Sequence, residues 1–228
     1  LVVHPSHAQA VIDAERFPHF AALGRDSAVF TNATSNYNVT SLSIPSFLTG
    51  RWLAPEDLRV GPYPIPKRYL NDSILSVLMR QGYKVEEDDE GFPLLRSHPE
   101  LFVPEASSLY YRIMVPRLLR QYLPLSPQSH AYTLSLWDDF LEGVSGSGSL
   151  GRVYFVHPLL PHEPSEFDRY GQRHPPPPPR DVAQMERAYE EQVMLVANLL
   201  GTRTEKLQAE GLYDRAVMVV PGAPGPRP

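Results

Sequence analysis

The chain of 228 residues contains no cysteine, which excludes disulfide bonds, zinc–thiolate sites and a cysteine nucleophile. No apolar run approaches the roughly 18 residues that a membrane-spanning helix needs. Basic residues are fewer than acidic ones, and the net charge of −5 comes without a basic patch, so no nucleic-acid partner is expected. The first residues lack both the basic region of a signal peptide and an initiator methionine. We therefore expect an internal start and no signal or transmembrane segment in this chain.

Hydrophobic residues make up 42% of the chain, which indicates a globular protein, and the length suffices for one α/β domain with a core. Hydrophobic periodicity and capping signals predict helices at 17–23, 71–79, 132–141 and 181–211. They predict strands at 83–85, 152–156 and 216–220, the last two buried. This alternation predicts a three-layer α/β domain with a mostly parallel central sheet.

The helix expected at 181–211 carries one apolar stripe at near-helical spacing, which predicts core packing and no cofactor site: Met185, Tyr189, Val193, Val196, Leu200 and Leu207.

The most informative stretch covers residues 17–51, in which a segment rich in hydroxyl and amide side chains precedes Pro45. Because proline is tolerated in the first turn of a helix, Pro45 predicts that Thr40, Ser41 and Ser43 lie just before or at a helix N-terminus. Free backbone N–H groups at such an end favour an anion. A hydroxyl there is also the usual N-cap, so the residues alone leave both roles open.

This stretch resembles the sulfatase-like branch of the alkaline phosphatase superfamily, whose members carry a phrase of the form FPNFARLA…FTNAY…(T/C)xxS…LTGR. The chain has FPHFAALG from Phe17, FTNAT from Phe30 and LTGR ending at Arg51. Counting back from that Thr-Gly-Arg places Thr40 in the nucleophile position. The Cys-x-Pro-Ser-Arg consensus for formylglycine is absent, since residues 40–44 are TSLSI. The resemblance is therefore to members that use an unmodified threonine.

Two histidines follow the strand expected at 152–156. Ligands of open α/β sheets bind at the carboxyl ends of strands, which is where His157 and His162 are expected. The residues alone leave a structural or surface role for this pair open. The sequence HPLLPHEP, residues 157–164, resembles the HxLLPHxP phrase of bacterial sulfatase-like integral membrane proteins. That resemblance implies that His162, and with it His157, binds the phosphoryl or sulfuryl group of the substrate.

Two segments of biased composition have a plain interpretation and a functional one. The acidic run of residues 86–90 predicts a solvated loop, with metal binding as the alternative. The prolines of residues 175–179 predict a polyproline II spacer in a surface loop, with an SH3-type ligand as the alternative.

The resemblance implies a divalent metal, Mn, Zn, Mg or Ca, with Thr40 as one of its ligands. The family's other ligands are an acidic residue after its first strand and an Asp-His pair after the strand matched by residues 216–220. Residues 1–10 contain no carboxylate, and residues 221–228 are PGAPGPRP. We therefore expect that this chain does not retain the metal. We expect residues 1–220 to form a partial catalytic domain and 221–228 a tail outside the fold, as in a gene fragment with a frame-shifted end.

The function implied by the resemblance is that of a hydrolase or transferase acting on phosphate or sulfate esters through a metal-bound Thr40. Because metal ligands are missing, we expect the chain as written to be inactive. The alternative is a non-catalytic fragment or pseudoenzyme with a structural or interaction role, so whether the chain is an enzyme stays open. Family members usually face outward from the cell membrane, which implies an extracytoplasmic location and anchoring through segments outside this chain.

Overall fold

A computed structural model of the chain describes residues 3–4, 11–37, 40–53, 71–89, 134, 137–138, 151–158, 160–162, 165–178 and 181–222. Within these ranges the side chains of residues 3, 4, 11, 40, 41 and 86–89 are not described. The chain forms two compact units. The first unit comprises residues 1–33, 137–146 and 159–218, and the second comprises residues 34–136, 147–158 and 219–228.

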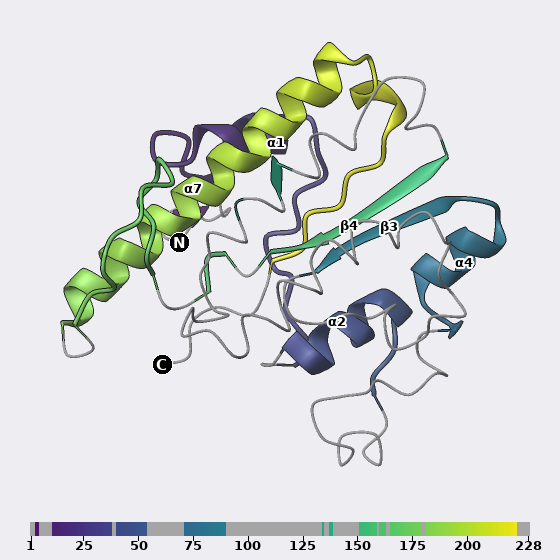
Figure 1. Cartoon of the computed structure of the whole chain (residues 1–228), viewed down its shortest axis with the longest axis horizontal. Helices are drawn as coiled ribbons and strands as arrows, with labels where there is room; N and C mark the ends of the chain where they lie inside the picture. Colours follow the sequence, from purple (N-terminus) through teal and green to yellow (C-terminus); the bar gives the residue numbers. More distant parts are fainter. Residues whose placement is uncertain are drawn as a thin grey trace, which may run out of the picture. The chain divides into compact units, whose positions relative to one another are not determined.

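The first unit is built on a long helix, α7 (Val182–Ala209), with a short helix, α1 (Pro18–Arg25), packed against it (Figure 1). Two short strands, β1 (Val3–His4) and β2 (Val11–Ile12), pair antiparallel before α1. A single 3₁₀ turn, η4 (Tyr213–Arg215), follows α7.

Local signals explain where these helices begin and end. Pro18 opens α1, where its fixed φ angle suits the first helical position and its missing N–H costs no hydrogen bond. The side chain of Asp181 caps α7 by accepting a hydrogen bond from the backbone N–H of Gln184 at 2.9 Å. After α7, Gly211 has a φ of +66°, a value that favours glycine.

The core of the first unit lies between α1 and α7. Phe17 is 1% exposed and packs with Met194 and Ala197 of α7. At Gly201 the two helices approach so closely that a Cβ atom would overlap the imidazole of His19. The helices therefore meet through an aromatic anchor at one point and a backbone contact at another.

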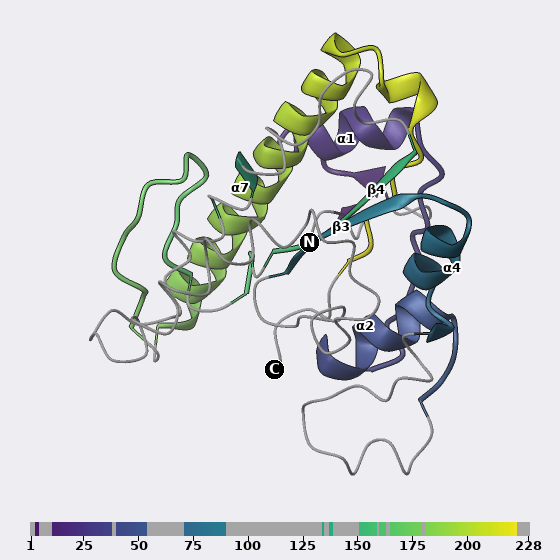
Figure 2. The ribbon, with the colours of Figure 1, turned by 45° about the vertical axis from the view of Figure 1, so that its right-hand side comes forward.

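The second unit holds a parallel strand pair, β3 (Lys84–Asp89) and β4 (Arg152–His157), and two helices, α2 (Thr40–Thr49) and α4 (Ile74–Arg80). Figures 1 and 2 both show the two strands side by side, with α4 leading into β3. Leu48 of α2, Leu75 of α4 and Val85 of β3 form the buried core of this unit. The chain is thus a mixed α/β protein with a small parallel sheet.

The structure confirms most of the predicted elements. Helices at 17–23, 71–79 and 181–211 correspond to α1, α4 and α7, and the strands at 83–85 and 152–156 correspond to β3 and β4. Of the helix predicted at 132–141, Leu134, Trp137 and Asp138 are described and are helical, and the other residues lie outside the described ranges. No helix among the described residues is long and apolar enough to span a membrane.

The buried strand predicted at 216–220 is wrong. These residues form no strand, and Val217 is 94% exposed. An apolar, β-branched sequence favours a strand only when a neighbouring strand completes its hydrogen bonds, and no strand in the described part of the chain pairs with this segment. The burial predicted for β4 is also too high, because all six of its residues are half-buried.

Three smaller predictions also need correction. Pro45 lies inside α2 and not in its first turn. Residues 86–89 of the acidic run belong to β3 and not to a loop. Of the predicted apolar stripe of α7, Leu200 is buried and the other members are half-buried, whereas the buried face includes two polar side chains, Gln192 and Arg203.

Candidate functional site

Thr40 is the first residue of α2, which confirms the predicted helix start. The backbone N–H groups of the first turn of a helix have no partner within the helix, so this end favours an anion. The side chains of Thr40 and Ser41 lie outside the described part of the structure. The direction of the Thr40 hydroxyl therefore stays a prediction.

Residues 36–37, which precede Thr40, are hydrogen-bonded to residues in and after the C-terminal half of α2. Ser46 is 1% exposed, and its hydroxyl accepts a hydrogen bond from Nδ2 of Asn36 at 2.7 Å and donates one to the carbonyl of Arg51 at 2.7 Å. The hydroxyl of Tyr37 accepts a hydrogen bond from the backbone N–H of Leu53 at 2.9 Å. These contacts bring the entrance and the exit of the helix together, and the sequence did not reveal them.

The end of the Thr-Gly-Arg phrase is also held in place. Gly50 has a φ of +64°, which favours glycine at this turn. The guanidinium of Arg51 pairs with Asp72, just before α4, at 2.9 Å. The stretch that carries the family resemblance therefore forms one connected local structure around α2.

His157 is the last residue of β4, as predicted, and is half-buried. Its register partner in β3 is Asp89, so the carboxyl ends of both strands meet at the same edge of the sheet. This edge is where ligands of parallel sheets bind. His157 and Thr40 belong to the same unit.

His162 is exposed and belongs to the first unit, where its backbone is fixed by Gln192 of α7. Gln192 is 0% exposed, and its Nε2 donates to the carbonyls of Pro161 and His162, each at 3.3 Å. Its Oε1 accepts hydrogen bonds from the backbone N–H groups of Glu166 and Phe167 at 3.0 and 3.3 Å. One amide thus ties two parts of the histidine-bearing loop to the helix. Because Thr40 and His162 belong to different units, their separation stays a prediction.

Asp168 organises the loop that follows. Its Oδ1 accepts hydrogen bonds from the backbone N–H groups of Tyr170 and Gln172, both at 2.9 Å, and its Oδ2 lies 3.2 Å from Nε2 of His174. Burial alone would raise the pKa of Asp168, but the hydrogen bonds from Gln172, His174 and Tyr170 outweigh it, so the pKa lies below its ordinary value. The charged form of Asp168 therefore stabilises the conformation of this loop.

A fork of charge-assisted hydrogen bonds joins this loop to α7. Nε of Arg169 donates to both carboxylate oxygens of Glu191, at 2.8 and 3.1 Å, and its Nη2 also contacts Oε1. The hydrogen bond from this guanidinium lowers the pKa of Glu191 and outweighs burial, which by itself would raise it. Nδ2 of Asn198 donates to the carbonyl of Arg169 at 3.0 Å, one further attachment of the loop to the helix.

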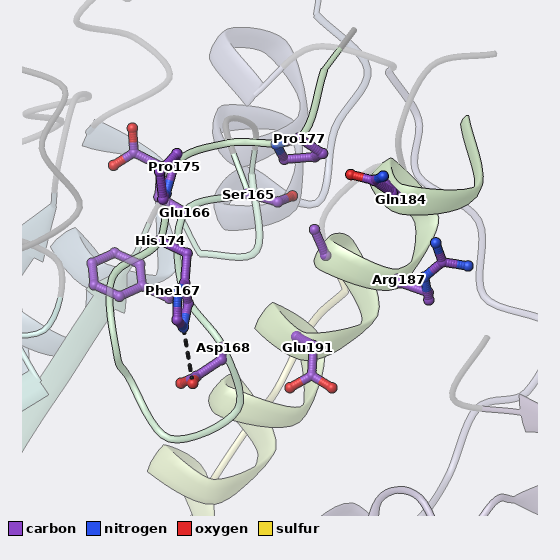
Figure 3. Close-up of a pocket in the computed structure, with 11 residues that line it drawn as sticks. Ser165, Glu166, Phe167, Asp168, His174, Pro175, Pro177, Gln184, Arg187 and Glu191 are labelled. Carbon is purple, nitrogen blue, oxygen red and sulfur yellow. Dashed lines mark hydrogen bonds and ion pairs between the residues drawn. The ribbon is translucent and has the colours of Figure 1, made fainter. Parts of the chain in front are cut away.

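Between this loop and α7 lies an open pocket of about 240 Å³ (Figure 3). Three carboxylates line it, and each already has a partner: Glu166 pairs with Arg173, Asp168 with His174, and Glu191 with Arg169. Neither Thr40 nor either candidate histidine lines the pocket. The pocket therefore does not belong to the site that the sequence predicts.

The divalent metal that the resemblance implies finds no complete ligand set among the described residues. A stable site needs about three or four protein ligands. The described residues contain no group of three or more histidine, aspartate and glutamate side chains that could hold a metal ion.

No known protein family, no curated protein and no solved structure matches the chain.

Proposed function

We propose that this chain is a sulfatase-like domain that binds phosphate or sulfate esters, with Thr40 in the nucleophile position and His162 and His157 on the transferring group. Its proposed architecture is the three-layer fold of the alkaline phosphatase superfamily. The observation that carries the proposal is that α2 begins at the residue to which the family phrase assigns the nucleophile. The parallel pair β3–β4, with His157 at its carboxyl end, supports it.

The chemistry that the resemblance implies for a complete domain is displacement at phosphorus or sulfur. There the threonine oxygen in the position of Thr40 would form a bond to the central atom while the ester bond breaks, and the alcohol would leave with the proton that the hydroxyl gives up. Backbone N–H groups at the start of α2 stabilise the charge on the non-bridging oxygens. A threonine hydroxyl is a weak nucleophile at neutral pH unless a base or a metal activates it. The described residues contain no group of three or more histidine, aspartate and glutamate side chains that could hold an activating metal, so we expect this chain to bind such an ester without turning it over.

A competing function, a pseudoenzyme with an interaction role, is favoured by the same lack of a ligand set among the described residues. The two differ in binding, because only the sulfatase-like domain recognises the ester group through Thr40 and His162.

The test is an assay on a generic phosphodiester and an aryl sulfate with added manganese, zinc or magnesium, together with binding of vanadate as an oxyanion probe. We expect no turnover, and vanadate binding that weakens in Thr40→Ala but not in Thr49→Ala, which removes a hydroxyl at the other end of α2. Turnover that disappears in Thr40→Ala would show that activating groups come from residues not described here. Vanadate binding that Thr40→Ala and His162→Ala leave unchanged would favour the pseudoenzyme.

A further inference from the structure

Arg203 of α7 is a buried cation whose hydrogen bonds are incomplete. The residue is 2% exposed, and its Nη1 donates to the carbonyl of Leu199 in the preceding turn at 2.8 Å. Its Nε and Nη2 are buried and have no hydrogen-bond partner. These two groups form the edge of the guanidinium that binds a carboxylate or a phosphate with two parallel hydrogen bonds.

Trp137, which packs against this guanidinium, carries another buried donor. The guanidinium carbon of Arg203 lies 4.4 Å from the centroid of the Trp137 ring, a cation–π contact. The indole is 7% exposed, and its Nε1 is also buried without a partner. Two stacked side chains from different parts of the chain thus present three N–H donors without an acceptor.

Burying these three donor atoms without an acceptor is costly, because each loses its hydrogen bonds to water. Buried donors in folded proteins accordingly almost always have partners. Burial lowers the pKa of Arg203 to about 10, and the charge of Asp138 only partly opposes this. Asp138 is itself exposed and makes no ion pair with Arg203 in the described structure. The nearest acid of the described chain therefore does not serve as the acceptor.

We propose that Arg203 and Trp137 bind a small oxyanion, a group with two neighbouring negatively charged oxygens as in phosphate, sulfate or a carboxylate. All the free groups are donors, which excludes a cation as the ligand. A water molecule could accept hydrogen bonds here but would leave the buried charge uncompensated. The site is distinct from Thr40 and from the pocket of Figure 3, which neither Arg203 nor Trp137 lines.

The chain has two tryptophans, so Trp52→Phe leaves Trp137 as the sole indole reporter. This variant is titrated with sodium phosphate, sulfate, acetate and chloride at constant ionic strength, following fluorescence and the unfolding temperature. We expect a saturable response to at least one oxyanion and none to chloride, with the preferred oxyanion identifying the ligand. Adding Arg203→Lys, which keeps the charge but loses the two-donor edge, should weaken binding by about tenfold or more. A response equally strong in Arg203→Lys would overturn the proposal.

Two matched variants locate the response. Arg187→Lys, on the same helix at the pocket, should leave the Trp137 fluorescence response unchanged. Thr40→Ala should leave that fluorescence response unchanged as well and should alter only the part of the unfolding-temperature response that comes from the proposed ester site. Loss of the response in Arg187→Lys would place the anion in the pocket, and its loss in Thr40→Ala would place it at the proposed ester site. Either result would overturn the assignment to Arg203, whereas failure of the Thr40 proposal alone would leave it standing.

A second measurement does not depend on a folded Arg203 variant. Because both side chains are buried, a ligand between them should exchange slowly and remain bound through purification. Ion chromatography of the denatured wild-type protein should release a stoichiometric oxyanion, and Trp137→Phe, which removes one donor, should release less. No released anion together with no saturable titration would show that water fills this role and would overturn the proposal.

Discussion

At the scale of single residues, Gln192 helps to fix where His162 lies. Its amide satisfies two backbone N–H groups and two backbone carbonyls of the loop at 161–167, and it is fully buried. A buried backbone group left without a hydrogen bond lowers the free energy of unfolding by its full desolvation penalty. The position of the histidine loop therefore depends on one side chain that makes no contact with a substrate.

Replacing Gln192 with alanine should lower the free energy of unfolding by about 2–3 kcal/mol, because four backbone groups lose their partner. Urea unfolding measures this. Gln208→Ala, an exposed glutamine of the same helix, is the control and should change the free energy by less than about 0.5 kcal/mol. Equal stability of the two variants would show that the loop is held by other contacts.

Asp168 makes the loop sensitive to acid. Its pKa in the folded protein is below the ordinary value of 3.8, so the carboxylate contributes stability that is fully present above that value. This contribution is lost as the pH falls through the folded pKa. Unfolding free energies measured between about pH 6 and pH 2 should therefore fall less steeply in Asp168→Asn than in the wild type. Asp26→Asn, at an exposed aspartate, is the control and should keep the pH dependence of the wild type. The same pH dependence in Asp168→Asn and the wild type would refute this role.

At the scale of elements, the close approach of α1 to α7 constrains the packing of the first unit. It depends on Gly201, where a side chain would meet the His19 ring, and on Phe17 packed against Met194 and Ala197. A glycine in the middle of a helix costs up to about 1 kcal/mol relative to alanine. The close contact therefore offsets a weakness of α7 itself.

Gly201→Ala tests which of these effects is larger. The gain in helix propensity is about 1 kcal/mol, but forcing a methyl group into the His19 ring costs about 1–3 kcal/mol, so we expect net destabilisation. Adding His19→Ala should restore stability, and Gly222→Ala, which meets no atom within 4 Å, should be neutral. A Gly201→Ala protein more stable than the wild type would show that α1 shifts freely on α7.

The elements that sequence predicts well are those with local signals. Ser73 and Asp181 cap α4 and α7, and Gly82 and Gly211 follow these helices with positive φ angles. Each signal acts within one turn of the chain, so it can be recognised without knowledge of distant contacts.

The elements and side chains that sequence predicts poorly depend on distant partners. Residues 216–220 have the composition of a strand but no strand to pair with in the described structure. Gln192 and Arg203 are polar residues on a helix, a pattern typical of a solvated face, yet both are buried. Their partners lie in the loop at 161–167 and at Trp137, so no local pattern reveals their role.

At the scale of the whole molecule, the structure confirms a mixed α/β chain with a parallel strand pair. The three-layer architecture stays a prediction. So does the single site, because Thr40 and His157 belong to one unit and His162 to the other. The family resemblance requires that these residues face a common ligand.

The most direct test of this claim is an experimentally determined structure of the chain with bound vanadate. We expect Oγ1 of Thr40 and the imidazole of His162 to lie within about 12 Å of each other and to face the same vanadate ion, close enough to be bridged by the ligand and one water molecule. A structure in which the two side chains lie much farther apart, or in which vanadate binds elsewhere, would show that they do not form one site.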